Sequence, residues 1–416
     1  MDTQANKISE FAPGKSNGLI NLLWECAIAV LFFYVFFYQN AVGSISGGVI
    51  ILCALVIALG AGKWILRNRY TLKINFMFFL SLFVLLSVFI SYFTSTSPKL
   101  TQDVSLRMVE YLLAALALYS FLIWNPGRLH RVIFYLWLSL VALTVYVLFN
   151  GEEVEASGAI GVESLNINLL SSFLLLQFFC SFLLWRRTKN KIMKLVCLLT
   201  SAVAFFVQIQ SASRRGFIII CVFVLAVLFW GVLAYNAKKR SLSSQIFSAL
   251  LILALALGAY FLATYVMEQT VLGQRLAGAF TSGDDARDYY QRVALEQFRA
   301  HPVFGIGLNG VAGILGVYSH SLYYEVLACT GLVGALILFA CLLCLGYQLL
   351  RRCRLTADRN PDDVFLFRCS FLFWACTMAS GLAVVMIYDF YFYISLALLA
   401  ACVSISAPPK KVKKEA

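Results

Sequence analysis

Charged residues are scarce in this chain, where Asp, Glu, Lys and Arg together make up only 13% of 416 residues. A typical soluble domain has about 25% charged residues, so this scarcity excludes an ordinary water-exposed fold. Hydrophobic residues reach 61%, with 35 Phe side chains that suit contact with lipid acyl chains. Cysteine is absent from residues 267–320, so no disulfide can hold this long polar segment. The composition predicts an integral membrane protein.

Long apolar runs make up most of the sequence. A helix needs about 20 apolar residues to cross the hydrocarbon core of a bilayer. Runs of about this length lie near 19–38, 42–62, 75–94, 108–124, 130–149, 166–185, 193–210, 216–235, 246–266, 321–350, 364–387 and 390–407. The pattern predicts an all-α, polytopic integral membrane protein. We expect a single membrane domain, residues 1–416, with about 12 transmembrane helices.

The net charge of +13 would suggest a nucleic-acid partner in a soluble protein. Here the basic residues instead recur in every second connection, as the positive-inside rule requires of cytoplasmic loops. These residues are Lys63, Arg67, Arg69 and Lys73; Arg128 and Arg131; Arg186, Arg187, Lys189, Lys191 and Lys194; Lys238, Lys239 and Arg240; and Arg351, Arg352, Arg354 and Arg359. We therefore expect both termini in the cytoplasm and no binding to nucleic acid.

The longest polar segment, residues 267–320, lies between the ninth and tenth predicted spans on the extracytoplasmic side. Long loops without secondary structure are uncommon, so we expect short helices in it. One of them is predicted over 288–300, where apolar and aromatic residues recur at helical spacing. Arg287 and Arg292 lie here among acidic residues. Their simplest interpretation is a solvated helix with ion pairs such as Asp288–Arg292.

Arg214 and Arg215 oppose the charge bias, because they lie together at the extracytoplasmic start of a span. An ionised group at membrane depth costs several kcal/mol unless it has a partner. One interpretation is that both arginines reach the interface and are neutralised by lipid phosphates. The alternative is an anion-binding clamp, because a guanidinium group binds phosphate oxygens with two parallel hydrogen bonds.

Two further polar residues on this side have alternative interpretations. His320 precedes the tenth span and, with an ordinary pKa near 6.5, can accept a proton at neutral pH. A single histidine at a helix start can equally be a capping or interfacial residue. Asp389 lies in the short turn between the last two spans. It either pairs with an arginine of this region or only marks the turn.

Three short elements together resemble a known family. His320-Ser321 is followed after nine residues by Gly331 and after two more by Gly334, which resembles the histidine signature of bacterial O-antigen ligases. The stretch His301-Pro-Val-Phe-Gly-Ile-Gly307 and the element Ser213-Arg214-Arg215-Gly216 resemble two further motifs of the O-antigen ligase and polymerase superfamily. They occur in the family order. Where the family has one arginine this chain has two, so the sequence leaves open which of Arg214 and Arg215 faces a substrate.

This resemblance implies a glycosyltransferase of the GT-C-like kind, which transfers O-antigen from undecaprenyl diphosphate to the outer core sugar of lipid A-core. It implies the inner membrane of a Gram-negative bacterium, with the active site at the periplasmic face and residues 267–320 as one wall. His320 would be the general base, and Arg214 or Arg215 would stabilise the leaving diphosphate. Arg287, Arg292 and Asp389 would bind substrate. No Asp-x-Asp motif occurs in the loops, so we expect no metal and no cofactor, and a monomer or weak oligomer in contact with membrane lipids.

Other functions remain open from the sequence. An O-antigen polymerase, or a transferase that attaches the glycan to protein, would share the donor and the fold. A secondary transporter is an alternative of another class, but transporters place polar residues near the bilayer midplane. In this chain, Glu25 and Arg368 are the main charges expected in mid-span. A structural scaffold would make His320 and the arginines dispensable.

Overall fold

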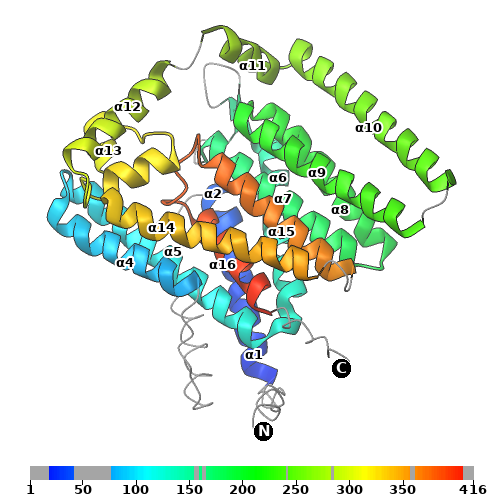
Figure 1. Ribbon diagram of the computed structural model, residues 1–416, viewed down its shortest axis with the longest axis horizontal. Coiled ribbons are helices and arrows are strands. Elements are labelled where there is room, and N and C mark those ends of the chain that lie inside the picture. Colours follow the sequence, from blue (N-terminus) through cyan, green and yellow to red (C-terminus); the bar gives the residue numbers. More distant parts are fainter. Residues whose placement is uncertain are drawn as a thin grey trace, which may run out of the picture.

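The structure, a computed structural model, describes residues 18–41, 76–153, 159–161, 165–239, 242–282, 285–356 and 361–405. Long helices form a bundle, and a group of shorter helices lies across one of its ends (Figure 1). The predicted span 42–62, and the basic residues of the connection that follows it, lie outside the described residues.

The chain begins with α1 (Gly18–Phe32), a π-helical segment η2 (Phe33–Tyr38) and α2 (Gln39–Ala41). The bundle continues with α4 (Phe76–Thr94), α5 (Pro98–Trp124), the 3-10 turn η3 (Pro126–Arg128), α6 (Leu129–Asn150), α7 (Ile167–Arg187), α8 (Lys191–Gln210), α9 (Arg214–Lys239) and α10 (Leu242–Gln269). The short helices are α11 (Val271–Ser282), α12 (Asp285–Ala300) and α13 (Gly310–Leu315), followed by α14 (Leu322–Leu355), α15 (Pro361–Ser380) and α16 (Phe390–Ile405). Two short strands, β1 (Glu152–Glu153) and β2 (Ile160–Gly161), pair antiparallel.

Within the described residues, nine helical segments are long and apolar enough to cross a membrane. Each coincides with a span predicted from the sequence. The helix α10 covers the predicted span 246–266, and α16 is a shorter apolar helix of 16 residues at the position of the last predicted span. The protein is therefore an all-α, multi-pass membrane protein. A total of twelve spans stays a prediction.

The helix α16 is enclosed by the bundle, with every side chain from Phe390 to Val403 buried against its neighbours, including α5, α7 and α15. A helix that is apolar on all sides is expected in such a position. Its 16 residues extend only about 24 Å, less than the roughly 30 Å of hydrocarbon. Residues 381–389 are not helical, although the sequence predicts helix to 387. Irregular backbone at this depth is tolerated where protein covers it or where it lines a cavity.

The helix α14 is bent at Gly331, which has a φ of +63°. The chain from Pro302 to Gly307 packs into this bend: the Ile306 N–H donates to the Ala328 carbonyl at 2.9 Å, and the Leu332 N–H donates to the Pro302 carbonyl at 2.8 Å. A side chain at residue 331 would overlap the Val303 backbone. The glycine of the histidine signature thus forms one joint with the His301–Gly307 stretch.

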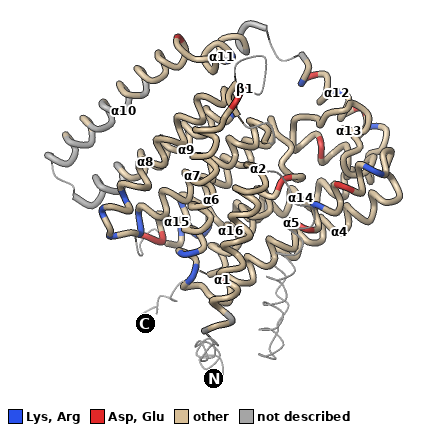
Figure 2. Tube along the Cα trace, turned by 180° about the vertical axis from the view of Figure 1, so that it is seen from behind, with Lys and Arg blue, Asp and Glu red and all other residues tan. Residues whose placement is uncertain are grey.

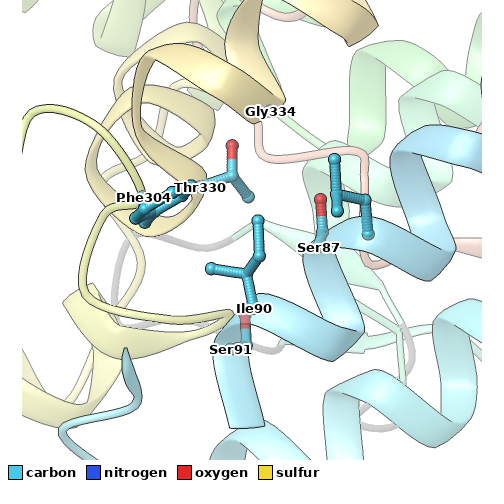
Figure 3. A pocket seen from close by; sticks show the side chains of 7 residues that line it. Ser87, Ile90, Ser91, Phe304, Thr330 and Gly334 are labelled. Atoms are coloured by element: carbon cyan, nitrogen blue, oxygen red, sulfur yellow. The ribbon is translucent and has the colours of Figure 1, made fainter. Parts of the chain in front are cut away.

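A narrow crevice lies beside this joint, where Phe304, Thr330 and Gly334 face Ser87, Ile90 and Ser91 of α4 (Figure 3). None of its lining residues is titratable. We therefore interpret the crevice as a packing feature and not as a catalytic site.

The opposite end of the bundle is rich in Lys and Arg, which gather near the ends of α8 and α15 (Figure 2). Glu25 of α1 is buried there, and it pairs with Arg128, lies 3.5 Å from Arg131 and accepts a hydrogen bond from Tyr135 at 3.0 Å. This carboxylate, which the sequence places as an exception in a span, is thus satisfied by the basic end of the bundle. The basic end lies away from α11–α13, as the charge pattern predicts.

Candidate active site

A cavity of about 160 Å³ opens near the end of the bundle that carries α12 and α13. Its walls come from α5, the start of α7, the segment before α14 and the irregular segment before α16. The lining residues are Val104, Arg107, Asn166, Asn168, Leu169, Tyr318, His320, Val384, Val385, Tyr388 and Asp389. The polar and titratable members converge from segments more than 280 positions apart in the sequence.

His320 lies at the wall of this cavity, on the loop between α13 and α14. Its φ is +57°, in the left-handed region that residues other than glycine rarely adopt. The ring centroid of Tyr290, from α12, lies 5.6 Å from that of the imidazole, with 33° between the ring planes. The histidine is half-buried. Backbone strain of this kind is found at functional sites more often than elsewhere, where the surrounding structure enforces it.

Arg215 is the second residue of α9, and its side chain bridges two other helices. Its Nη2 donates to the Asn168 carbonyl of α7 at 2.7 Å, and its Nη1 donates to the Ser380 carbonyl at the end of α15 at 3.1 Å. The Nε–H group is buried and has no hydrogen-bond partner among the described residues. The helix α15 ends at Ser380, so its negative dipole end faces the guanidinium group. The two hydrogen bonds fix the orientation of the guanidinium fork, and its buried Nε–H has no partner among the described residues.

Arg214 points elsewhere. Its Nη1 lies 3.3 Å from the Arg275 carbonyl of α11, so this side chain reaches the outer helices while Arg215 turns into the bundle. The residue Ala212, just before them, has a φ of +51°, which turns the chain from α8 into α9. The two adjacent arginines thus occupy different surroundings, which the sequence alone could not show.

The close packing of α7 and α9 explains the glycine that follows these arginines. A side chain at Gly216 would overlap Ser171 of α7. The Ser213 hydroxyl donates to the Asn168 Oδ1 atom at 3.0 Å, and the Asn166 side chain caps α7 by accepting from the Asn168 N–H at 2.8 Å. The Ser-Arg-Arg-Gly element therefore fastens α9 to the start of α7, where two asparagines face the cavity.

Asp389 lines the cavity and lies within electrostatic range of Arg215. Burial raises the pKa of its carboxyl to about 7, and the positive charge of Arg215 opposes that rise. Of the two roles left open by the sequence, this placement favours association with an arginine. The residue also ends the turn, because its N–H donates to the Met386 carbonyl at 3.0 Å.

The helix α12 crosses the mouth of the site. Arg287 is half-buried and close enough to Arg215 for their charges to interact. Tyr290 is three residues further on, hence on the same side of the helix, and contacts His320. Arg215 and Arg287 do not line the cavity themselves but interact electrostatically with each other, and Arg215 does so with Asp389 of the cavity wall, whereas Arg292 is exposed on another side of α12. The structure thus brings together His320, Arg215, Arg287 and Asp389, whereas Arg214 and Arg292 lie at the periphery.

A comparison with protein families matches residues 199–339 to the family described as O-antigen ligase. Over this segment, about a third of the chain, the sequence is similar to the O-antigen ligase family. No curated protein matches the chain. The matched segment contains Arg214, Arg215 and His320, which are the residues that the motifs point to, and also Arg287.

The rest of the candidate site comes from outside the matched segment. Asn168 and Asp389 lie before and after it, and so does Arg107 of α5, which sequence reasoning missed. The apolar run in the sequence begins near 108, just after Arg107, whereas the helix α5 begins at Pro98 and therefore includes Arg107. The signal was present: an arginine at an extracytoplasmic span end opposes the positive-inside rule as Arg214 and Arg215 do.

Glu325 is the second residue that sequence reasoning missed. It is fully buried in the first turn of α14, five residues after His320. A carboxylate inside an apolar span is a functional candidate by default, and this was the signal that could have found it.

Proposed function

We propose that the protein is an O-antigen ligase, which transfers O-antigen polysaccharide from undecaprenyl diphosphate to the outer core sugar of lipid A-core. The observation that carries the proposal is the convergence of His320, Asp389 and Arg215 at one end of the bundle. Similarity to the O-antigen ligase family supports this class of reaction. The charge pattern supports placing this end at the periplasmic face of a bacterial inner membrane.

The donor side of the reaction needs positive charge. When the bond between the anomeric carbon and the diphosphate oxygen breaks, the leaving diphosphate takes the electron pair. Preorganised cationic donors stabilise charge that develops in this way, without reorganisation of water. Arg215 offers an oriented guanidinium group with an unused Nε–H, and Arg287 lies nearby. The polyprenyl chain would lie along the apolar helix surfaces.

The acceptor side needs a base, because a sugar hydroxyl has a high pKa. His320 lies at the cavity wall, where its imidazole accepts the hydroxyl proton as the acceptor oxygen attacks the anomeric carbon. Displacement from the side opposite the diphosphate inverts the configuration at that carbon. The asparagines and Tyr318 of the cavity offer hydrogen-bonding groups for sugar hydroxyls. The cavity beside His320 would therefore hold the acceptor sugar.

The test is the lipopolysaccharide pattern of a deletion strain that carries either the wild-type protein or His320→Ala. We expect wild type to restore long-chain lipopolysaccharide, and His320→Ala to leave bare core while lipid-linked glycan accumulates. Normal long-chain product with His320→Ala would overturn the general-base role. Single repeat units on core in the deletion strain would instead identify a polymerase, which the same superfamily includes.

A further inference from the structure

The buried carboxylate of Glu325 has no part in the chemistry proposed above. Its side chain is 0% exposed, and it lies beneath the loop that carries His320. Burial of an ionised carboxylate is unfavourable unless several donors satisfy it. Its surroundings therefore indicate what it does.

Three donors converge on the two carboxylate oxygens. The Ser319 N–H donates to Oε2 at 3.0 Å. The Tyr388 hydroxyl donates to Oε1 at 3.3 Å, and the Cys329 thiol lies 3.4 Å from the same oxygen. In all three contacts the carboxyl oxygens of Glu325 are the acceptors, because N–H, O–H and S–H groups donate.

Each of the first two donors adjoins a residue of the proposed site. Ser319 precedes His320, whose backbone is strained, and Tyr388 precedes Asp389. The Tyr388 hydroxyl also accepts the Asn309 N–H at 2.9 Å, which ties in the segment before α13. Glu325 is thus the common acceptor that joins the histidine loop to the aspartate turn.

We propose that Glu325 is a positioning residue, which fixes His320 and Asp389 relative to each other through Ser319 and Tyr388. This rests on the proposed function, in which His320 is the base. A misplacement of about 1 Å at a reacting group can cost roughly 10²-fold in rate. Since Glu325 touches neither substrate in this arrangement, its loss acts on turnover and not on substrate binding.

The experiment compares Glu325→Gln, Tyr388→Phe and the double variant with wild type, each purified in full length. Glutamine keeps the size of the side chain, but its amide nitrogen would face one of the two donors. Tyr388→Phe keeps the ring and removes only the hydroxyl. Glu296→Gln, the same change at an exposed position of α12, is the matched control. Tm and the folded yield are measured beside kcat and KM for lipid-linked donor and acceptor.

We expect kcat to fall about 10²-fold in Glu325→Gln, with both KM values within about twofold of wild type and Tm nearly unchanged. The kcat of the double variant should lie within about twofold of that of the slower single variant, because both changes break the same hydrogen bond. Wild-type kcat in Glu325→Gln would overturn the proposal, as would losses that multiply in the double variant. If Glu325→Gln does not fold, Tyr388→Phe alone decides, by the same kcat criterion. Absence of transfer by wild type, or full activity of His320→Ala, would instead refute the proposed function.

Discussion

Arg215→Lys separates shaped recognition of a diphosphate from simple attraction between charges. The guanidinium group of Arg215 makes two hydrogen bonds to carbonyl oxygens, at 2.7 and 3.1 Å, and its buried Nε–H has no partner among the described residues. Lysine preserves the positive charge, but a single ammonium group cannot reproduce that planar fork. The variant therefore tests geometry at constant charge.

The expected magnitude follows from the donors that are lost. Removing one preorganised donor to developing negative charge costs about 3–4 kcal/mol, or roughly 10²–10³ in kcat. Arg214→Lys should cost less than about tenfold, because Arg214 reaches the Arg275 carbonyl of α11 and not the interior. Arg299→Lys, at an exposed position of α12, should have no effect and is the matched control.

The assay measures transfer of lipid-linked glycan to a core acceptor by purified protein in lipid, with donor saturating and the folded fraction checked for each variant. If Arg215→Lys kept full kcat, charge alone would suffice and the interpretation of the oriented fork would be wrong. Equal losses in Arg214→Lys and Arg215→Lys would also refute the distinction that the structure draws between the two side chains.

Three further perturbations test other parts of the structure. Gly331→Ala should lower Tm by several degrees, because alanine is strained at a φ of +63° and its side chain would overlap the backbone of Val303. An unchanged Tm would contradict the close packing of the His301–Gly307 stretch against the bend in α14. The folded-state pKa of Asp389 is raised from 3.8 to about 7, so its carboxyl favours folding at low pH and loses that contribution as pH rises from about 4 to about 7. Asp389→Asn should therefore flatten Tm against pH in that window, and a profile parallel to wild type would contradict the shift. Arg107→Gln should raise KM for the anionic substrates about five- to tenfold in low salt and by less in high salt, because salt screens the lost charge. The control Lys99→Gln on the same helix should leave KM unchanged. Steady-state kinetics at two salt concentrations measures both.

The sequence predicts more of the fold than of the site, because each membrane helix depends on a short stretch of sequence whereas the site depends on contacts between residues far apart in the chain. A stretch of about 20 apolar residues must satisfy its own backbone hydrogen bonds in lipid, so composition over a short window is enough to specify a helix. The errors lie at the ends, where packing decides. The helix α5 begins ten residues before its predicted start at 108, and the last turn begins at 381 although helix was predicted to 387.

The motifs indicated a resemblance to the superfamily and pointed to His320 and the arginine pair, because each motif is local and its residues lie close together in the chain. Sequence alone left Arg214 and Arg215 equivalent. Adjacent side chains on a helix point in directions about 100° apart, and which direction faces the site depends on where the neighbouring helices lie. The structure places Arg215 between α7 and α15 and Arg214 beside α11.

Local composition by itself thus determined an all-α membrane protein and the predicted sides of its loops, and the resemblance of short motifs to a known family implied the candidate chemistry at His320. Tertiary packing decided which of those residues meet. Asp389 approaches Arg215 only because α16 is short and enclosed, which leaves residues 381–389 inside the bundle. Arg107 enters the site from α5, which carries none of the motifs, and Glu325, although it lies within the histidine signature, meets Tyr388 only through the packing of α14 against the turn before α16. Contacts between distant parts of a chain depend on how its helices pack and not on the residues beside them in sequence.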